Sequence, residues 1–190
     1  MTTIIIAFPP SAGGNHLKNI LTLDYNTALA LYNKSTTTFH TQPGTNLKEQ
    51  SCMDALSIPG LHILHGHFAE IMSYQKYIDQ IQNKKFVILS PDTPNDRSLL
   101  RARQKSLGQN QTSLSAEDYF DQEQVFLYEP FMYTRYFNTP MSQIMNISIS
   151  EWFTDNIDPV IKRLTQFLEI DLDVNRVRQL HNIWLTKARL

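Results

Sequence analysis

Residues 3–21 combine a β-branched strand, a short loop with two glycines and an apolar helix, and this combination restricts the fold more than any other part of the chain. Ile4-Ile5-Ile6 is typical of a buried parallel strand, and Gly13 and Gly14 follow in a tight loop. Apolar residues then recur at helical spacing, at Leu17, Ile20 and Leu21. Such a strand, loop and helix aim backbone N–H groups and a positive helix end at an anion. The segment therefore predicts an α/β protein that binds a phosphorylated ligand.

Two common nucleotide-binding motifs are absent from this loop. Gly13-Gly14 is followed by Asn15-His16 and not by the Lys-Ser pair of G-x-x-x-x-G-K-[ST], and there is no G-x-G-x-x-G sequence. The missing lysine and serine weigh against a Walker-type phosphotransferase, which remains an alternative.

Composition places the chain among ordinary globular proteins. Its 190 residues predict one domain, 1–190, with a sizeable core. A net charge of −1 gives no field for nucleic acid or anionic membranes, and no apolar run approaches spanning length. The single cysteine, Cys52, indicates a reducing compartment, and Ile4-Ile5-Ile6 is too short for a signal peptide, so we expect a cytoplasmic protein.

Further strands and helices are expected along the chain. Leu61 to His65 and Phe86 to Leu89 read as strands, each followed by a helix or turn, which predicts a parallel sheet with crossovers. Asp96 is expected to cap a helix that extends to about Leu107. In the second half we expect a helix over 116–128, an irregular aromatic stretch over 131–145, a short strand over 146–149, and helices that open at Asp158 and Asp173. The predicted fold is one α/β domain of P-loop type, with a mainly parallel sheet flanked by helices and a helical C-terminal half.

The glycine loop resembles the 5′-phosphosulfate loop of the sulfotransferase family, roughly Y-P-K-S-G-T-T-W-L before an apolar helix. Pro10 matches the family proline, Gly13 the glycine, and His16 takes the aromatic position. Ser11 stands where the family has a lysine that touches the transferred sulfate, and Lys18, one turn into the helix, is the candidate to replace that charge. The resemblance implies that the loop binds 3′-phosphoadenosine 5′-phosphosulfate, through backbone N–H groups at its helical end. The expected binding residues are Pro10, Ser11, Ala12, Gly13, Gly14, Asn15 and His16.

The C-terminal half is similar to the same family in the order of its elements. Ile147 to Trp152 lies where sulfotransferases carry a strand that ends in a Tyr-Glu-Asp-Leu-like stretch, and Phe167 to Leu172 lies where they carry Phe-Leu-Gly-Leu. The chain is short for the family, so the resemblance implies a minimal, divergent member.

A histidine cluster follows the second expected strand. His65 and His67 share one face of that strand, whose carboxyl end should lie beside the glycine loop. Sulfotransferases place a general-base histidine at about this point, and His67 or His65 is the matching candidate, since imidazole titrates near neutral pH. Two other interpretations stay open: the His-x-His pair binds a metal, or both rings are structural. No third metal ligand is identifiable from spacing, so we expect no metal.

A basic helix follows the third expected strand, where the family binds the 3′-phosphate through R-x-P-x-D-x-x-x-S. Pro94 and Asp96 fit this pattern, but its arginine and serine are missing. Arg97, Arg101 and Arg103 are candidates to supply the charge, because guanidinium groups suit bidentate phosphate contact. A solvated basic helix face is the competing interpretation.

A dense aromatic group offers either an acceptor pocket or helix core. Its members are Tyr119, Phe120, Phe126, Tyr128, Phe131, Tyr133, Tyr136 and Phe137, and Trp152 and Trp184 are expected in the core. The function that the resemblance implies is sulfuryl transfer to a hydroxyl or amine of a small molecule or glycan, with His67, His65 and Lys18 as catalytic candidates. A non-catalytic nucleotide- or anion-binding protein with the same fold is the other alternative.

Overall fold

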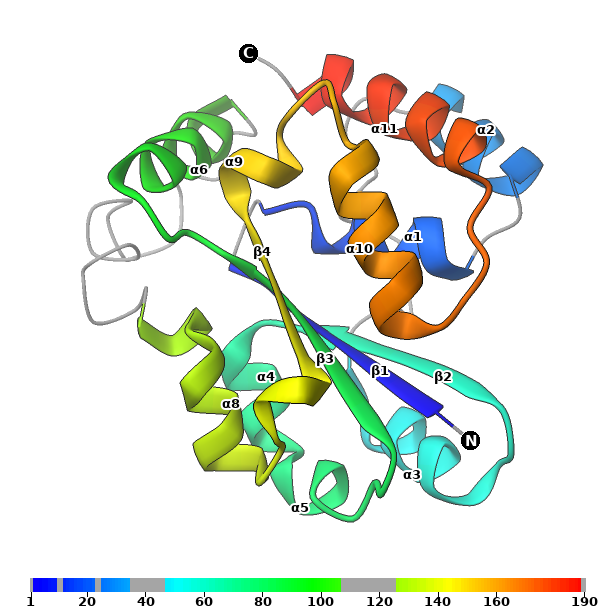
Figure 1. The fold of residues 1–190 in the computed structure, drawn as a ribbon, viewed down its shortest axis with the longest axis vertical. Coiled ribbons are helices and arrows are strands. Elements are labelled where there is room, and N and C mark those ends of the chain that lie inside the picture. The colour runs from blue at the N-terminus through cyan, green and yellow to red at the C-terminus, as the bar shows by residue number, and fades with distance from the viewer. Residues whose placement is uncertain (1, 10–11, 23–24, 35–46, 107–125, 189–190) are drawn as a thin grey trace.

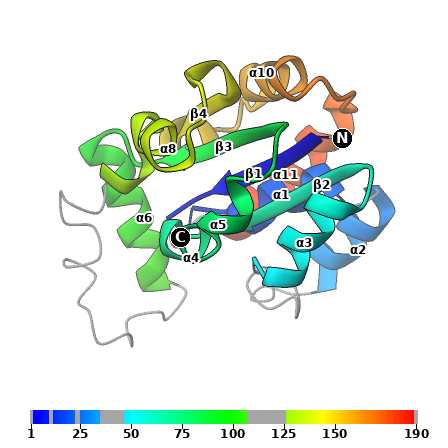
Figure 2. The same cartoon turned by 90° about the horizontal axis from the view of Figure 1, so that it is seen from below.

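The computed structural model describes residues 2–9, 12–22, 25–34, 47–106 and 126–188. Its centre is a four-stranded, all-parallel sheet in the order β2-β1-β3-β4, which Figure 2 shows stepping from one edge to the other. The strands are β1 (Thr2–Ala7), β2 (Leu61–Gly66), β3 (Lys84–Ser90) and β4 (Ile144–Ser148). The expected parallel α/β fold is therefore confirmed.

The two central strands are buried on both faces, as their continuous apolar sequences require. Ile4 and Ile6 of β1 contribute to one core, whereas Ile5 and Ala7 contribute to the other, because successive side chains point to opposite faces. β3 alternates in the same way, and its Ile88 pairs with Ala7. The sheet thus separates two hydrophobic cores (Figure 1).

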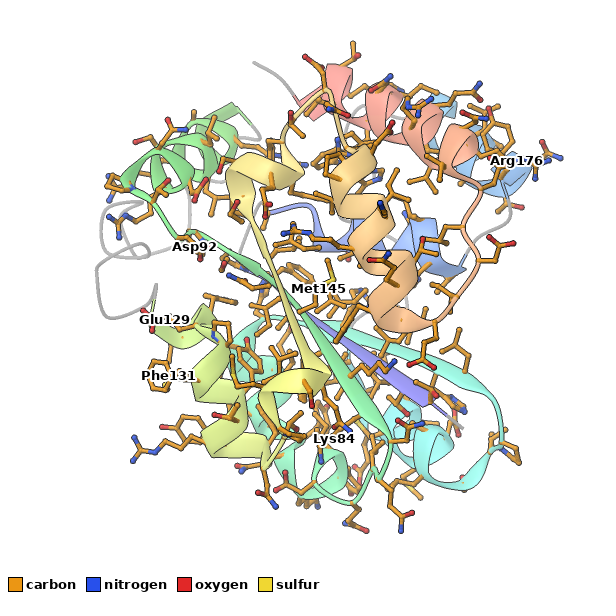
Figure 3. All side chains as sticks on the ribbon, in the orientation of Figure 1. Lys84, Asp92, Glu129, Phe131, Met145 and Arg176 are labelled. Carbon is orange, nitrogen blue, oxygen red and sulfur yellow. The ribbon has the colours of Figure 1, made fainter. Side chains whose placement is uncertain are left out.

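Helices cover both faces of the sheet (Figure 1). On the side of Ile4 and Ile6 lie α1 (Gly14–Thr22), α6 (Pro94–Ser106), α9 (Ile149–Trp152), α10 (Asp158–Leu168) and α11 (Val174–Ala188), with α2 (Tyr25–Lys34) packed on α11. On the other side lie α3 (Glu49–Ser57), α4 (Phe68–Ser73), α5 (Gln75–Ile78), the 3₁₀ turn η3 (Phe126–Tyr128) and α8 (Pro130–Phe137). A second 3₁₀ turn, η4 (Met141–Gln143), leads into β4, whose Met145 joins the core beneath α10 (Figure 3). No helix in these described ranges has both the length and the apolar character needed to cross a membrane.

The C-terminal helices begin where the sequence predicts. α10 starts at Asp158 with Pro159 in its first turn, and its stripe of Val160, Ile161 and Leu164 is buried. The Asp173 carboxylate accepts hydrogen bonds from the backbone N–H groups of Asn175 and Arg176, at 3.1 and 3.2 Å, and so caps α11.

Two expected elements differ from those in the structure. Residues 131–145 are not irregular, because α8 occupies Pro130–Phe137 and buries Met132, Tyr133 and Phe137 against the sheet. Burial of this aromatic face outweighs the modest helix propensity of its residues. The helix α6 begins before Asp96, which is the third residue of its first turn. The Asp96 carboxylate accepts from the N–H of Thr93 at 2.9 Å, and the Thr93 hydroxyl accepts from the N–H of Asp96 at 3.1 Å, so the two residues cap the helix together. Most of the helix expected over 116–128 lies outside the described residues.

The aromatic residues singled out from the sequence fall into a buried set and an exposed set. Tyr128, Tyr133 and Phe137 are core residues, as are Trp152 and Trp184, whereas Phe131 and Tyr136 are exposed. Tyr119 and Phe120, and the side chain of Phe126, lie outside the part of the chain that is described. The core interpretation therefore holds for the buried members.

We predict that Tyr133→Phe stabilises the protein. The Tyr133 hydroxyl is fully buried among aromatic rings and has no hydrogen-bond partner among the described residues. Removing an unsatisfied buried hydroxyl should raise the free energy of unfolding by about 1–2 kcal/mol. Urea denaturation measures the change, with Tyr136→Phe on the exposed side of α8 as the neutral control. A loss of stability in Tyr133→Phe would show that the hydroxyl has a partner.

Candidate functional site

The candidate site lies at the carboxyl ends of β1, β2 and β3. The strand order reverses between β1 and β3, because the next strand after β1 lies on one side and the next after β3 on the other. Open parallel sheets bind ligands in the crevice at such a reversal. The chain leaves β1 through Phe8 and Pro9, and it leaves β2 through His67, so these segments lie together.

The glycine loop turns tightly into α1. The N–H of Ala12 donates to the carbonyl of Pro9 at 3.1 Å, and Gly13 adopts a left-handed conformation with φ +81°. The N–H groups of Gly13 and Gly14 donate no hydrogen bond to any described residue, as is usual in the first turn of a helix. Pro10 and Ser11 lie outside the described residues.

Some of the expected backbone donors have hydrogen-bond partners within the loop. Two N–H groups of the loop are already used: that of Ala12 bonds Pro9, and that of His16 donates to the carbonyl of Gly13 at 2.9 Å. The ring of His16 points into the core, where it is 1% exposed. Burial, followed by the charges of His181 and Arg103, holds the pKa of His16 well below its ordinary value.

Phe8 links the loop to both histidines and was not singled out from the sequence. Its ring lies so close to Gly14 that a Cβ there would approach Phe8 Cδ1 to 2.0 Å, which only glycine avoids. The same ring stacks on His65, with centroids 6.1 Å apart, and meets the edge of His67 at 5.0 Å. The one available signal was its position, directly after a buried strand.

His67 is held by the loop itself. Its Nδ1 lies 2.8 Å from the carbonyl oxygen of Phe8, and a carbonyl only accepts, so the proton is on Nδ1. In the tautomer with this single proton, Nε2 is the acceptor nitrogen, and no described residue donates to it. The side chain is partly exposed at the N-terminus of α4, and its backbone N–H donates to Glu70 at 2.9 Å.

His65 has a different environment, although it is only two residues away. It is 3% exposed, and its Nε2–H donates to Oδ1 of Asn15, in the first turn of α1, at 3.0 Å. Burial, with the nearby charges of Lys18 and His67, lowers the pKa of His65 to about 4. A neutral ring with this hydrogen bond fixes Asn15 and so fixes the start of α1.

Lys18 supplies a cation beside this group. Its side chain is half-buried, and burial lowers its pKa. Within the described chain its ammonium has no hydrogen-bond or ion-pair partner, yet it is close enough to His65 to affect the pKa of that ring. A partly desolvated cation of this kind gains most from an incoming anion.

The basic helix α6 carries its arginines in three environments. Arg97 is half-buried and Arg101 is exposed, so both remain candidates for a phosphate contact. Arg103 is only 4% exposed, with its guanidinium 4.8 Å from the ring of Trp184, so the competing interpretation of a solvated helix face does not hold for this residue. Asp96 binds backbone, since its Oδ1 accepts from the N–H of Ser150 at 2.7 Å.

The end of β3 adds a small polar group at the same edge of the sheet. Asp92, labelled in Figure 3, accepts hydrogen bonds from Ser90 and from the Asn146 amide of β4, the latter at 3.1 Å. Among the described residues there is no group of three or more histidine, cysteine, aspartate or glutamate side chains arranged to hold a metal ion. No protein-family model matches the chain, and no curated protein matches it.

A cavity of about 460 Å³ lies elsewhere, at the amino end of the sheet. Thr3, Leu56, Gln80 and Asn83 are among the residues that line it, and its lining carries no charge. An anionic ligand therefore has no reason to prefer this cavity over the carboxyl ends of the strands.

We predict that His65 makes stability sensitive to acid. The folded pKa of about 4 lies below the ordinary 6.5, so the fold favours the neutral ring. This contribution, about 3 kcal/mol at most, is complete above pH 6.5 and is lost as the pH falls toward 4. His65→Gln keeps an N–H donor for Asn15 and does not titrate. Urea denaturation at several pH values across this range measures the free energy of unfolding of wild type and of His65→Gln. The difference between the two should shrink as the pH falls. If it stays constant with pH, the lowered pKa of His65 is contradicted.

Proposed function

We propose that the protein is a sulfotransferase that transfers a sulfuryl group from 3′-phosphoadenosine 5′-phosphosulfate to a hydroxyl or amine acceptor. The observation that carries the proposal is the position of His67. Its ring is hydrogen-bonded to Phe8, the first residue of the glycine loop, and its free Nε2 is left as a proton acceptor. The resemblance of the loop to a 5′-phosphosulfate loop and the half-buried cation of Lys18 support the same reaction.

In the proposed reaction the acceptor oxygen or nitrogen attacks sulfur, and its proton passes to Nε2 of His67. The bond between sulfur and the bridging oxygen breaks, and adenosine 3′,5′-bisphosphate leaves with the electron pair. The N–H groups of Gly13 and Gly14 and the ammonium of Lys18 would stabilise charge on the leaving phosphate. Lys18 would thus replace the lysine that the family has at Ser11, and Arg97 and Arg101 are proposed to bind the 3′-phosphate.

Titration calorimetry with adenosine 3′,5′-bisphosphate, with ATP as the competing nucleotide, tests the proposal. Preferential binding of the bisphosphate, with transfer of labelled sulfate to a panel of hydroxyl and amine acceptors, would support it. Binding without transfer to any acceptor would favour a non-catalytic nucleotide-binding protein. Preference for ATP would favour a phosphotransferase, and binding of neither would reject a nucleotide site.

Lys18→Met should weaken binding of adenosine 3′,5′-bisphosphate by about tenfold or more, the loss expected for a hydrogen bond to a charged group. Methionine keeps most of the length of the side chain and removes the charge. Lys162→Met is the matched control, because Lys162 is exposed and belongs to α10, not to the glycine loop or α1. Equal affinities in the two variants would exclude Lys18 from the site.

His67→Gln should lower turnover by about 100-fold and leave the affinity for the bisphosphate nearly unchanged, because a general base acts in the chemical step and not in nucleotide binding. Steady-state kinetics on the best acceptor measures this split. A change in KM for the donor with unchanged kcat would instead assign His67 to binding.

A further inference from the structure

The back of the glycine loop rests on the C-terminal helix. A Cβ at Gly13 would lie 2.5 Å from Cζ2 of Trp184, on α11, and 3.0 Å from Nε1 of Trp152, on α9. Both indoles are 1% exposed, so the backbone of Gly13 packs closely against two buried rings, those of Trp152 and Trp184. The left-handed conformation of Gly13 is the one that allows this contact.

His16 connects the first turn of α1 to Trp184 of the same aromatic pair. Its ring stacks on Trp184 with centroids 4.3 Å apart and planes 9° apart. His181 Nε2–H donates to the carbonyl of Thr154 at 3.1 Å, so its Nδ1 accepts the proton of His16 Nε2 at 3.2 Å. The start of α1 is therefore held to α11 by a stacked ring and by a hydrogen bond of fixed direction.

The basic helix α6 also packs on Trp184, through Arg103. The Arg103 guanidinium, from α6, lies 4.8 Å from the Trp184 ring and 5.2 Å from that of Phe153. Trp184 thus contacts the loop, the first turn of α1 and the basic helix. Rings packed in this way have few alternative positions, so movement of α11 would leave a void directly behind Gly13.

We propose that Trp184 is a positioning residue, and that docking of α11 holds the glycine loop in its anion-binding conformation. Binding of an anion by the loop and docking of α11 are then thermodynamically linked, and each raises the equilibrium constant of the other by the same factor. The effect of Trp184 on anion binding rests on the proposed function, whereas its effect on the conformation of the loop does not.

The test compares Trp184→Leu with Leu185→Ala. Leu185 is the adjacent residue on α11 and is equally buried, but it offers no ring to His16. Trp184→Phe is a milder variant that keeps an aromatic face, in case the leucine variant does not fold. Hydrogen exchange is followed at Ala12, His16 and Leu17, whose backbone N–H groups are hydrogen-bonded within the loop and the first turn of α1. This exchange and titration with adenosine 3′,5′-bisphosphate are measured well below the unfolding transition of each variant.

Trp184→Leu should speed exchange at Ala12, His16 and Leu17 and weaken bisphosphate binding, by about tenfold each, with a smaller effect for Trp184→Phe. Leu185→Ala should leave both within about twofold, and bisphosphate should slow exchange across α11 in the wild type. Equal changes in Trp184→Leu and Leu185→Ala would overturn the proposal, because both would then reflect lost stability alone. If the wild type does not bind the bisphosphate, the proposed function fails, while the exchange comparison still decides the role of Trp184.

Discussion

Close packing on both sides of the glycine loop is the constraint on which the candidate site depends. The Cα of Gly14 lies against the ring of Phe8, and the Cα of Gly13 lies against the indole of Trp184, so neither position has room for a side chain. This close packing on both sides fixes the residue at which α1 begins. The start of α1 in turn places Asn15 against His65 and brings the ammonium of Lys18 close to that ring.

The two histidines at the end of β2 differ in their surroundings: His65 belongs to the strand, whereas His67 follows it at the N-terminus of α4. His65 is buried, neutral and bonded to Asn15, so it supports the geometry of the loop. His67 is partly exposed and is oriented by the backbone of Phe8, so it keeps a free acceptor nitrogen. The structural and the acid–base interpretations of the cluster therefore divide between its members, with acid–base chemistry proposed for His67 alone.

Local patterns were sufficient to predict the parallel sheet and to bring the glycine loop beside the end of β2. Ile4 to Ile6, Gly13 and the helical spacing after it lie within one short segment, and parallel strands bring the end of β2 beside it. Side-chain direction was not predictable in the same way. His16 turns inward because it meets His181, 165 residues later, and Arg103 turns inward because it meets Trp184. Such long-range partners leave no periodic signal near the residues that they reorient. The aromatic helix α8 was missed for a related reason, since its stability comes from packing on Phe86 and the sheet.

Backbone amide NMR during titration with adenosine 3′,5′-bisphosphate tests most directly whether this edge of the sheet is an anion site. The account predicts saturable shifts that are largest at Gly13, Gly14 and Lys18, with a shift of the His67 ring signals. Shifts centred instead on the amino-end cavity near Thr3 and Gln80, or no saturable shifts at all, would contradict it.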